Sequence, residues 1–197
     1  MGMQRHLVIG DVHGCHQELL DLCDRAAVAE GDVLVSVGDL VDRGPSPRET
    51  VRFFRERAAA VVLMGNHERK HVRQVCSYAQ DVTRLQMGEE YESFVAWASA
   101  LPYFYETDAA RVVHAAMMPG VPLAMQREDV LAGTTSGEAF LESELGGVSW
   151  HELLRGAGAG RVWPPCLRER PARREKRHLW ARYGGVSRAH AHGALAA

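Results

Sequence analysis

Three short polar segments, each directly after an apolar run, carry residue types that bind metals and phosphate. They read GDVHG at 10–14, GDLVDRG at 38–44 and GNHE at 65–68. Together they offer carboxylates, imidazoles, an amide and a guanidinium. Carboxylate and imidazole groups in one set suit divalent ions such as Mn, Fe, Zn or Co. The pattern therefore indicates a metal site that could act on a phosphate ester.

The candidate side chains could cooperate around two ions. Asp11 and His13 stand two positions apart on one loop, where both can face one ion. Asp39, at the end of the next apolar run, could bridge two ions about 3.5–4 Å apart, which would acidify a shared water and clamp a phosphate for in-line attack. Arg43 could contact that phosphate through two N–H groups, as lysine cannot.

Each of these signals has an ordinary explanation when taken alone. Asp and Gly are common in turns, Asn66, His67 and Glu68 could cap a helix, and His114 after the apolar run RVV could be a core histidine. All four elements in this order, each after an apolar run, make turn chemistry a poor explanation. Two further histidines on expected helices, His16 and His71, are interpreted as solvated.

The elements that must position these residues alternate between strands and helices. Apolar runs at 6–11, 32–39 and 59–66 are typical of buried strands. Ser46 as N-cap and Pro47 at the first helical position predict a helix over 46–57. Other helices are expected over 15–31, 68–79 and 89–100, before a hairpin-like pair, YFYET and RVVHAA. This alternation favours an α/β domain, in which ligand sites gather at the carboxyl ends of the strands.

Composition limits the class of protein. A chain of 197 residues with 46% hydrophobic residues can bury one core and rarely two. It contains no apolar run of about 18 residues and no signal-peptide pattern at its start. The four cysteines form no CxxC pair. We therefore expect a cytoplasmic protein with no membrane partner.

The charge is distributed unevenly along the chain. Residues 156–197 carry nine Lys or Arg against two Asp or Glu, whereas 1–155 carry 14 against 23. Such a division can indicate an acidic domain with a basic arm for nucleic acid. From Gly156 onward, however, helical and strand periodicities both vanish, and Gly, Pro, Ala and Arg dominate.

The three motifs resemble those of the calcineurin-like metallophosphoesterases, in the phosphoprotein-phosphatase type that the DRG ending distinguishes from nuclease-type relatives. The resemblance covers residues 6–155, and the segment 114–138 is similar to that of a bacterial subgroup. It implies a central β-sandwich flanked by helices, with the C-terminal strands missing or disordered here. It also implies two divalent ions, with Mn favoured and Fe, Zn, Ni or Co as alternatives.

The resemblance further implies how the ions would be held. Asp11, His13 and Asp39 would bind the first, and Asp39 would bridge to a second that Asn66 and His114 complete. Members of the family carry one more histidine, in a Gly-His pair after a late strand, and this sequence has no Gly-His pair.

The remaining roles also follow from the resemblance. His67 would be the general acid for the leaving group, oriented by Asp42, and Arg43 and Asn66 would contact the phosphate. The implied function is hydrolysis of phosphate monoesters, with a phosphoserine or phosphothreonine protein as the first candidate substrate. The alternatives are a small phosphoester such as diadenosine tetraphosphate, or an inactive chain that lacks one ligand.

The genetic code offers an explanation for the unusual C-terminal composition. Trp has the single codon TGG, so reading one base forward turns Trp163 before Pro164 into Gly, and the next codon can encode His. The same shift turns Trp180 into Gly. We therefore expect an incomplete metallophosphoesterase domain over 1–155 and a disordered, frame-shifted tail over 156–197. Binding of nucleic acid is not expected.

Overall fold

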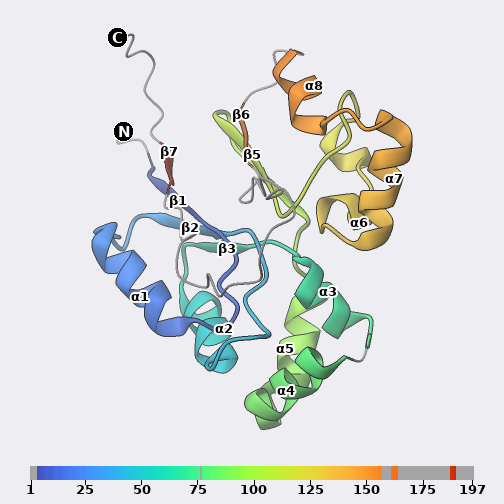
Figure 1. Cartoon of the computed structure of the whole chain (residues 1–197). Helices are drawn as coiled ribbons and strands as arrows, with labels where there is room; N and C mark the ends of the chain where they lie inside the picture. Colours follow the sequence, from blue (N-terminus) through green and yellow to red (C-terminus); the bar gives the residue numbers. More distant parts are fainter. Residues whose placement is uncertain (1–3, 76, 157–160, 164–186, 190–197) are drawn as a thin grey trace, which may run out of the picture.

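The computed structural model describes residues 4–75, 77–156, 161–163 and 187–189. Its elements (Figure 1) are, in chain order, β1 (His6–Ile9), α1 (His16–Arg25), β2 (Val33–Ser36), α2 (Pro47–Glu56), β3 (Ala60–Val62), α3 (Asn66–Val72), α4 (Tyr78–Met87), η1 (Gly88–Glu90), α5 (Tyr91–Ala98), β4 (Phe104–Glu106), β5 (Ala110–Val113), η2 (Leu123–Met125), α6 (Glu128–Leu131), α7 (Thr135–Leu145), α8 (Trp150–Gly156), β6 (Arg161–Trp163) and β7 (Ser187–Ala189).

The strands form two sheets. In the first, the order is β3-β2-β1-β7, with β1, β2 and β3 parallel and β7 antiparallel to β1. The helical crossovers α1 and α2 make this parallel pairing possible, because parallel neighbours need a long connection. In the second sheet, β5 pairs antiparallel with β4 and parallel with β6. The carboxyl ends of β1, β2 and β3 consequently lie at one edge.

Successive residues of the parallel strands pack into two different core clusters. Leu7, Ile9 and Leu34 belong to the core cluster shared with the helices. Val8 and Val35, their neighbours in the chain, belong to a second cluster that includes residues of β4 and β5. Successive side chains of a strand point to opposite faces, so the parallel sheet has helices on one face and the other sheet on its opposite face.

The predicted fold class is confirmed: the molecule is α/β, with two sheets packed together and helices on their outer faces. In Figure 1, α1 and α2 cover the β1–β3 sheet, while α6, α7 and α8 lie on the side of β5. No helix within the described part of the chain has the length and apolar character needed to cross a bilayer.

The predicted helix over 68–79 is wrong in its extent. Helix α3 ends at Val72, and a separate helix, α4, begins at Tyr78. Gln74 has a φ of 54°, which no continuing right-handed helix allows. The other predicted helix starts agree more closely, and Pro47 is the first residue of α2 with Ser46 as its N-cap.

The C-terminal region is described only at β6 and β7. Strand β6 extends the second sheet, where Trp163 is the partner of Val112, and β7 pairs with β1. Most of the tail predicted over 156–197 lies outside the described residues. Its interpretation as a frame-shifted segment therefore stays a prediction.

We predict that Leu34→Ala lowers the free energy of unfolding by about 2–5 kcal/mol, because Leu34 is fully buried in the central strand. Urea unfolding followed by circular dichroism measures this. The matched control is Leu85→Ala on α4, where the side chain is 83% exposed and the change should stay within about 0.5 kcal/mol. Equal losses in the two variants would contradict the assigned core.

Candidate metal centre

The loops that follow β1, β2 and β3 converge on one recess, together with the residue that follows β5. Asp11, Asp39, Arg43, Asn66 and His114 all line a cavity of about 1230 Å³. The sequence places these residues up to 103 positions apart, and the strand order brings their side chains to one edge. This is the place where open α/β sheets bind ligands.

Two groups of potential metal ligands share one carboxylate. His13, Asp39 and His67 offer ligand atoms within 4.8 Å of one another, and so do Asp11, Asp39 and His114. Asp39 is thus common to both groups, as the sequence predicts. The groups differ from the predicted sets, because His13 clusters with His67 and not with Asp11.

The three histidines of the two ligand groups all have Nδ1 engaged in a hydrogen bond. The Nδ1 of His13 lies 2.8 Å from the carbonyl of Val41, and that of His114 lies 3.0 Å from the carbonyl of Val37. The Nδ1 of His67 lies 2.5 Å from the Asp42 carboxylate. Because these acceptors require a proton on Nδ1, each neutral ring keeps its Nε2 lone pair for the recess. Histidines that bind metals are commonly oriented this way.

The charges in the recess favour a cation. Desolvation raises the pKa of the Asp11 carboxyl, and repulsion by the charge of Asp39 raises it further. Burial lowers the pKa of His13 and favours its neutral form. Asn66 adds a buried Oδ1 that has no hydrogen-bond partner among the described residues. This donor set fits divalent ions with mixed oxygen and imidazole ligation.

The backbone around the recess is locally strained. His13, Asp39, Asp42 and Arg43 have φ values of 48°, 54°, 67° and 71°. The left-handed region costs an L-residue roughly 1–2 kcal/mol, and such strain concentrates at functional sites. A Cβ on Gly44 would lie 2.1 Å from the carbonyl oxygen of His13, so the first and second loops approach each other only because this residue is glycine.

Glu68 holds the second loop in place. Its fully buried carboxylate accepts hydrogen bonds from the backbone N–H groups of Asp39 and Leu40, each at 2.7 Å. Burial, together with the nearby Asp39 charge, raises the pKa of Glu68 to about 7. The sequence interpretation treated Glu68 only as a possible capping residue. Its place in GNHE was visible, but its backbone partners lie 28 and 29 positions away.

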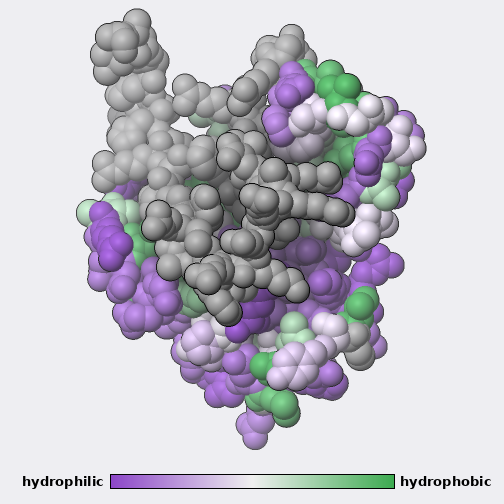
Figure 2. All heavy atoms as spheres, in the orientation of Figure 1, coloured by the Kyte–Doolittle hydropathy of each residue, from purple (hydrophilic) through white to green (hydrophobic). Residues whose placement is uncertain are grey.

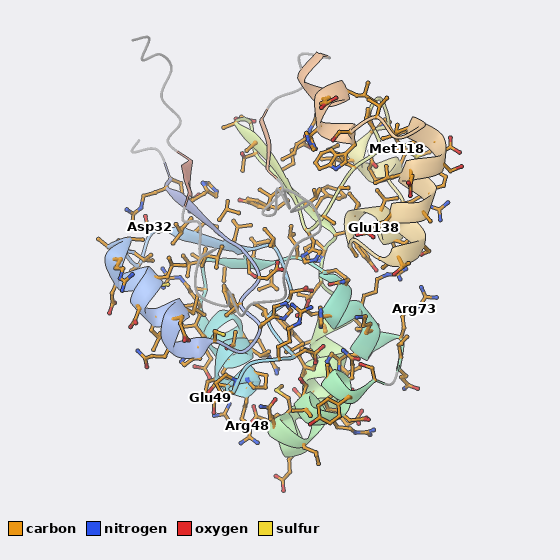
Figure 3. The ribbon with its side chains drawn as sticks, viewed as in Figure 1. Asp32, Arg48, Glu49, Arg73, Met118 and Glu138 are labelled. Atoms are coloured by element: carbon orange, nitrogen blue, oxygen red, sulfur yellow. The ribbon has the colours of Figure 1, made fainter. Side chains whose placement is uncertain are left out.

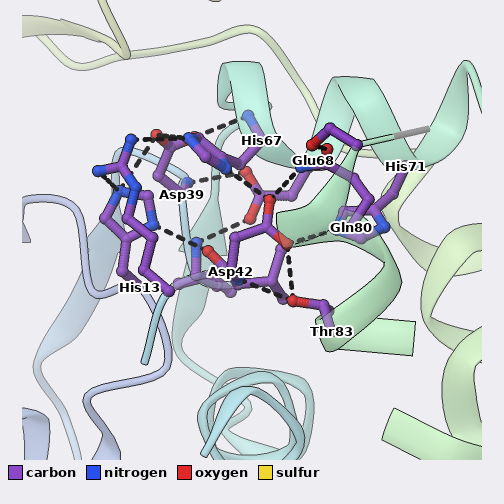
Figure 4. Close-up of polar contacts among 12 residues, drawn as sticks. His13, Asp39, Asp42, His67, Glu68, His71, Gln80 and Thr83 are labelled. Carbon is purple, nitrogen blue, oxygen red and sulfur yellow. Dashed lines mark hydrogen bonds and ion pairs between the residues drawn. The ribbon is translucent and has the colours of Figure 1, made fainter. Parts of the chain in front are cut away.

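Asp42 is the centre of a buried hydrogen-bond network (Figure 4). It accepts from His67, from Gln80 and, at 2.6 Å, from the hydroxyl of Thr83. Burial alone would raise the pKa of the Asp42 carboxyl, but hydrogen bonds from His67, His71 and Thr83 hold it well below its usual range. Asp42 therefore stays a carboxylate and fixes the ring of His67.

His71 corrects one sequence interpretation. It was expected to be solvated, yet its side chain is buried, and its Nε2 lies 3.0 Å from the second oxygen of Asp42. Its Nδ1 lies 3.1 Å from the Tyr91 hydroxyl. The reason is helical spacing: His67 and His71 are four residues apart on α3, so both reach the same carboxylate. His16, the other such histidine, is half-buried.

Arg43 contacts two histidines of the site, His13 and His67. One guanidinium nitrogen lies 2.8 Å from Nε2 of His13, and another lies 3.1 Å from Nε2 of His67. An ion bound by His13 would have to replace the first of these contacts. Released from it, the guanidinium can turn its N–H groups toward an anion in the cavity that Arg43 lines.

Fold and site together define a metallohydrolase. The family model for calcineurin-like phosphoesterases matches residues 5–143. The chain belongs to the calcineurin-like phosphoesterases, as its motifs predict.

Proteins similar to this chain include a curated tetraphosphatase and two solved structures. A symmetrical bis(5'-nucleosyl)-tetraphosphatase of Aromatoleum aromaticum is 35% identical over 75% of this chain, which spans 60% of that protein's length. A crystal structure provisionally described as a diadenosine tetraphosphatase superposes with a TM-score of 0.64 at 28% identity, over 81% of this chain and 73% of the other. A Saccharomyces cerevisiae protein serine/threonine phosphatase shares the fold, with a TM-score of 0.50 at 21% identity over 61% of this chain and 41% of the other.

We predict that Glu68→Gln weakens Mn²⁺ binding by about 10–100-fold, because the amide cannot accept both backbone hydrogen bonds and the loop of Asp39 loses its support. Isothermal titration calorimetry measures the affinity, and circular dichroism checks that the variant folds. Glu89→Gln, at an exposed position, is the control and should bind as the parent does. Unchanged affinity in a folded Glu68→Gln protein would show that the hydrogen bonds accepted by Glu68 do not support the site.

Proposed function

We propose that this protein hydrolyses a dinucleoside tetraphosphate symmetrically, releasing two nucleoside diphosphates. The observation that carries the proposal is the pair of ligand groups sharing Asp39, in a chain whose curated relatives are symmetrical tetraphosphatases. The chain spans 60% and 49% of the length of two of these relatives. Family membership supports a hydrolase that acts on phosphate esters, and the substrate is the step proposed here.

Five residues would hold the metal ions. Asp11, His13, Asp39 and His114 belong to the two ligand groups that share Asp39, and Asn66 would add its unpartnered Oδ1. His67, the remaining member of these groups, is assigned the proton transfer described below. Divalent ions held there would supply positive charge for the phosphoryl oxygens and would acidify the attacking water. The donor set does not discriminate among Mn, Fe, Zn, Ni and Co. Manganese, which the family resemblance favours, is the first metal to test.

The neighbouring residues would carry the proton and orient the phosphate. Arg43 and Asn66 would hold the phosphoryl group from which the leaving nucleoside diphosphate departs. Asp42 would stabilise the protonated ring of His67, whose Nε2 then donates a proton to the leaving oxygen. Water forms a new P–O bond as the bridging P–O bond breaks, so each product ends as a diphosphate.

A phosphoprotein substrate was the first expectation from the sequence, and the comparisons favour the alternative. The relatives from Aromatoleum aromaticum and Methylococcus capsulatus are both symmetrical bis(5'-nucleosyl)-tetraphosphatases. The protein phosphatase neighbour is similar at 21% identity, which supports a common fold and nothing about substrate. We therefore place the small phosphoester first.

The frame-shift hypothesis bears on whether the second ion is held. Strand β6 runs parallel to β5 and ends at Trp163, paired with Val112, which stands two positions before His114. This pairing belongs to the residues as read, Arg161–Trp163, and does not bear on the shifted frame, so the hypothesis stays a prediction. The coding DNA across codons 150–165 tests it: a shifted frame without a Gly-His pair would contradict it.

We predict that Mn²⁺-loaded protein converts diadenosine tetraphosphate to ADP as the sole nucleotide product, measured by anion-exchange chromatography. His67→Gln should lower kcat by about 10²–10⁴-fold, since the general acid is lost. His6→Gln is the control, because His6 contacts Tyr105 on the other sheet. A mixture of ATP and AMP, or hydrolysis of phosphopeptides alone, would refute the proposed substrate.

We also predict that the metal-loaded chain holds about two ions, as two-metal hydrolases do, and that chelation abolishes hydrolysis of p-nitrophenyl phosphate. Metal analysis after gel filtration gives the stoichiometry. One ion or none, with no hydrolysis, would instead support the interpretation of an inactive chain.

A further inference from the structure

The cavity extends well beyond the metal-ligand groups. Besides the candidate ligands it is lined on one side by the basic residues Arg69, Lys70 and Arg73 of α3 and its C-cap. On another side it is lined by residues of α7 and the turn into α8, which are Glu138, Leu141, Glu142, Leu145, Val148 and Trp150. At about 1230 Å³, it offers far more room than one phosphate group needs.

The basic side begins at a metal-ligand candidate. Asn66, Lys70 and Arg73 are spaced at i, i+4 and i+7, so they follow one face of α3 away from the site. With a rise of 1.5 Å per residue, Lys70 and Arg73 stand about 6 and 10 Å along the axis from Asn66. This spacing leads a row of positive charge outward from the candidate metal centre.

Two of the three basic side chains are available to a ligand. Arg69 is occupied, because it contacts Glu128 at 4.0 Å and the hydroxyl of Tyr103. Among the described residues, neither Lys70 nor Arg73 has an ion-pair or hydrogen-bond partner for its side chain. Ammonium and guanidinium groups that face a cavity without partners are suited to bind anionic oxygens.

The side of the cavity formed by α7 and the turn into α8 is acidic and apolar. Glu138 and Glu142 stand one helical turn apart on α7, are exposed, and have no ion-pair partner in the described part of the chain. Beside them lies apolar surface, including Val148, which is 48% exposed, and the half-buried Trp150. Figure 3 shows Glu138 on α7 and Arg73 at the end of α3. In Figure 2 the upper right of the molecule, where α7 lies in Figure 1, carries both hydrophilic and hydrophobic surface.

This combination suits a nucleotide better than a phosphate group alone. The carboxylates of α7 repel phosphate, so they would keep a phosphate chain on the α3 side. Carboxylates accept hydrogen bonds from ribose hydroxyls, as in dinucleotide-binding folds. Apolar surface with a tryptophan offers a base a face for stacking.

We propose that this groove binds one nucleoside diphosphate half of the substrate. Lys70 and Arg73 contact the phosphates beyond the reacting one, Glu138 and Glu142 face the ribose, and Val148 and Trp150 face the base. The proposal rests on the proposed function for the identity of the whole substrate, but the groove can be tested with ADP alone. Lys70 and Arg73 are thereby specificity residues for a phosphate chain, separate from the candidate catalytic residues.

The test compares binding of ADP and of inorganic phosphate to the full Mn²⁺-loaded chain by isothermal titration calorimetry. A single phosphate bound at the metal centre does not also reach Lys70 and Arg73, whereas ADP bound there extends along α3. For the double variant Lys70→Ala/Arg73→Ala, we expect the Kd of ADP to rise at least about tenfold, because two charge-assisted hydrogen bonds are lost. The Kd of phosphate should change much less. Arg25→Ala, an exposed charge on α1, is the control and should change neither.

Two outcomes for the double variant would contradict the proposed groove. One is an unchanged Kd for ADP, and the other is an equal rise in the Kd values of ADP and phosphate. A second variant, Glu138→Gln, weakens the proposed ribose contact and should raise the Kd of ADP while leaving the Kd of phosphate unchanged. An unchanged Kd of ADP in this variant would contradict the placement of the ribose. Failure to hydrolyse diadenosine tetraphosphate, with the ADP result as expected, would reject the proposed function and leave the groove standing.

Discussion

The buried carboxylate of Asp42 is the constraint on which the site depends. It lies in the loop after β2 and receives hydrogen bonds from α3, through His67 and His71, and from α4, through Gln80 and Thr83. A buried carboxylate is costly unless its oxygens are satisfied, and here both oxygens are. The loop can therefore hold Asp42 and Arg43 at positive φ, because the network stabilises a conformation that the backbone alone disfavours.

A second level of order comes from the groups that fix each candidate ligand. The carbonyls of Val41 and Val37 hold the rings of His13 and His114, and Glu68 holds the backbone at Asp39. These supports come from the segment that follows β2 and from the start of α3. The site thus inherits its geometry from the sheet, and a ligand meets donors that are already oriented.

Residue types and spacing in the sequence predicted the candidate ligands and the strand ends that carry them. Apolar runs before each motif were enough, because strands in a parallel sheet end at one edge. Helix α4 was missed, although Ser77 and Gln80 have the spacing of a capping box. His71 was also misjudged, since its burial depends on Asp42, which is 29 positions away in the chain. Local patterns reveal helix faces and turns, but they do not reveal which distant group a polar side chain will meet.

The central claim is that the strand ends hold two divalent ions that share the carboxylate of Asp39. Electron paramagnetic resonance of the Mn²⁺-loaded chain tests it most directly, because two ions bridged by one carboxylate couple magnetically. The account predicts a coupled-pair spectrum that Asp39→Asn converts to that of isolated Mn²⁺. A spectrum of isolated Mn²⁺ in the parent protein at every metal loading would contradict it.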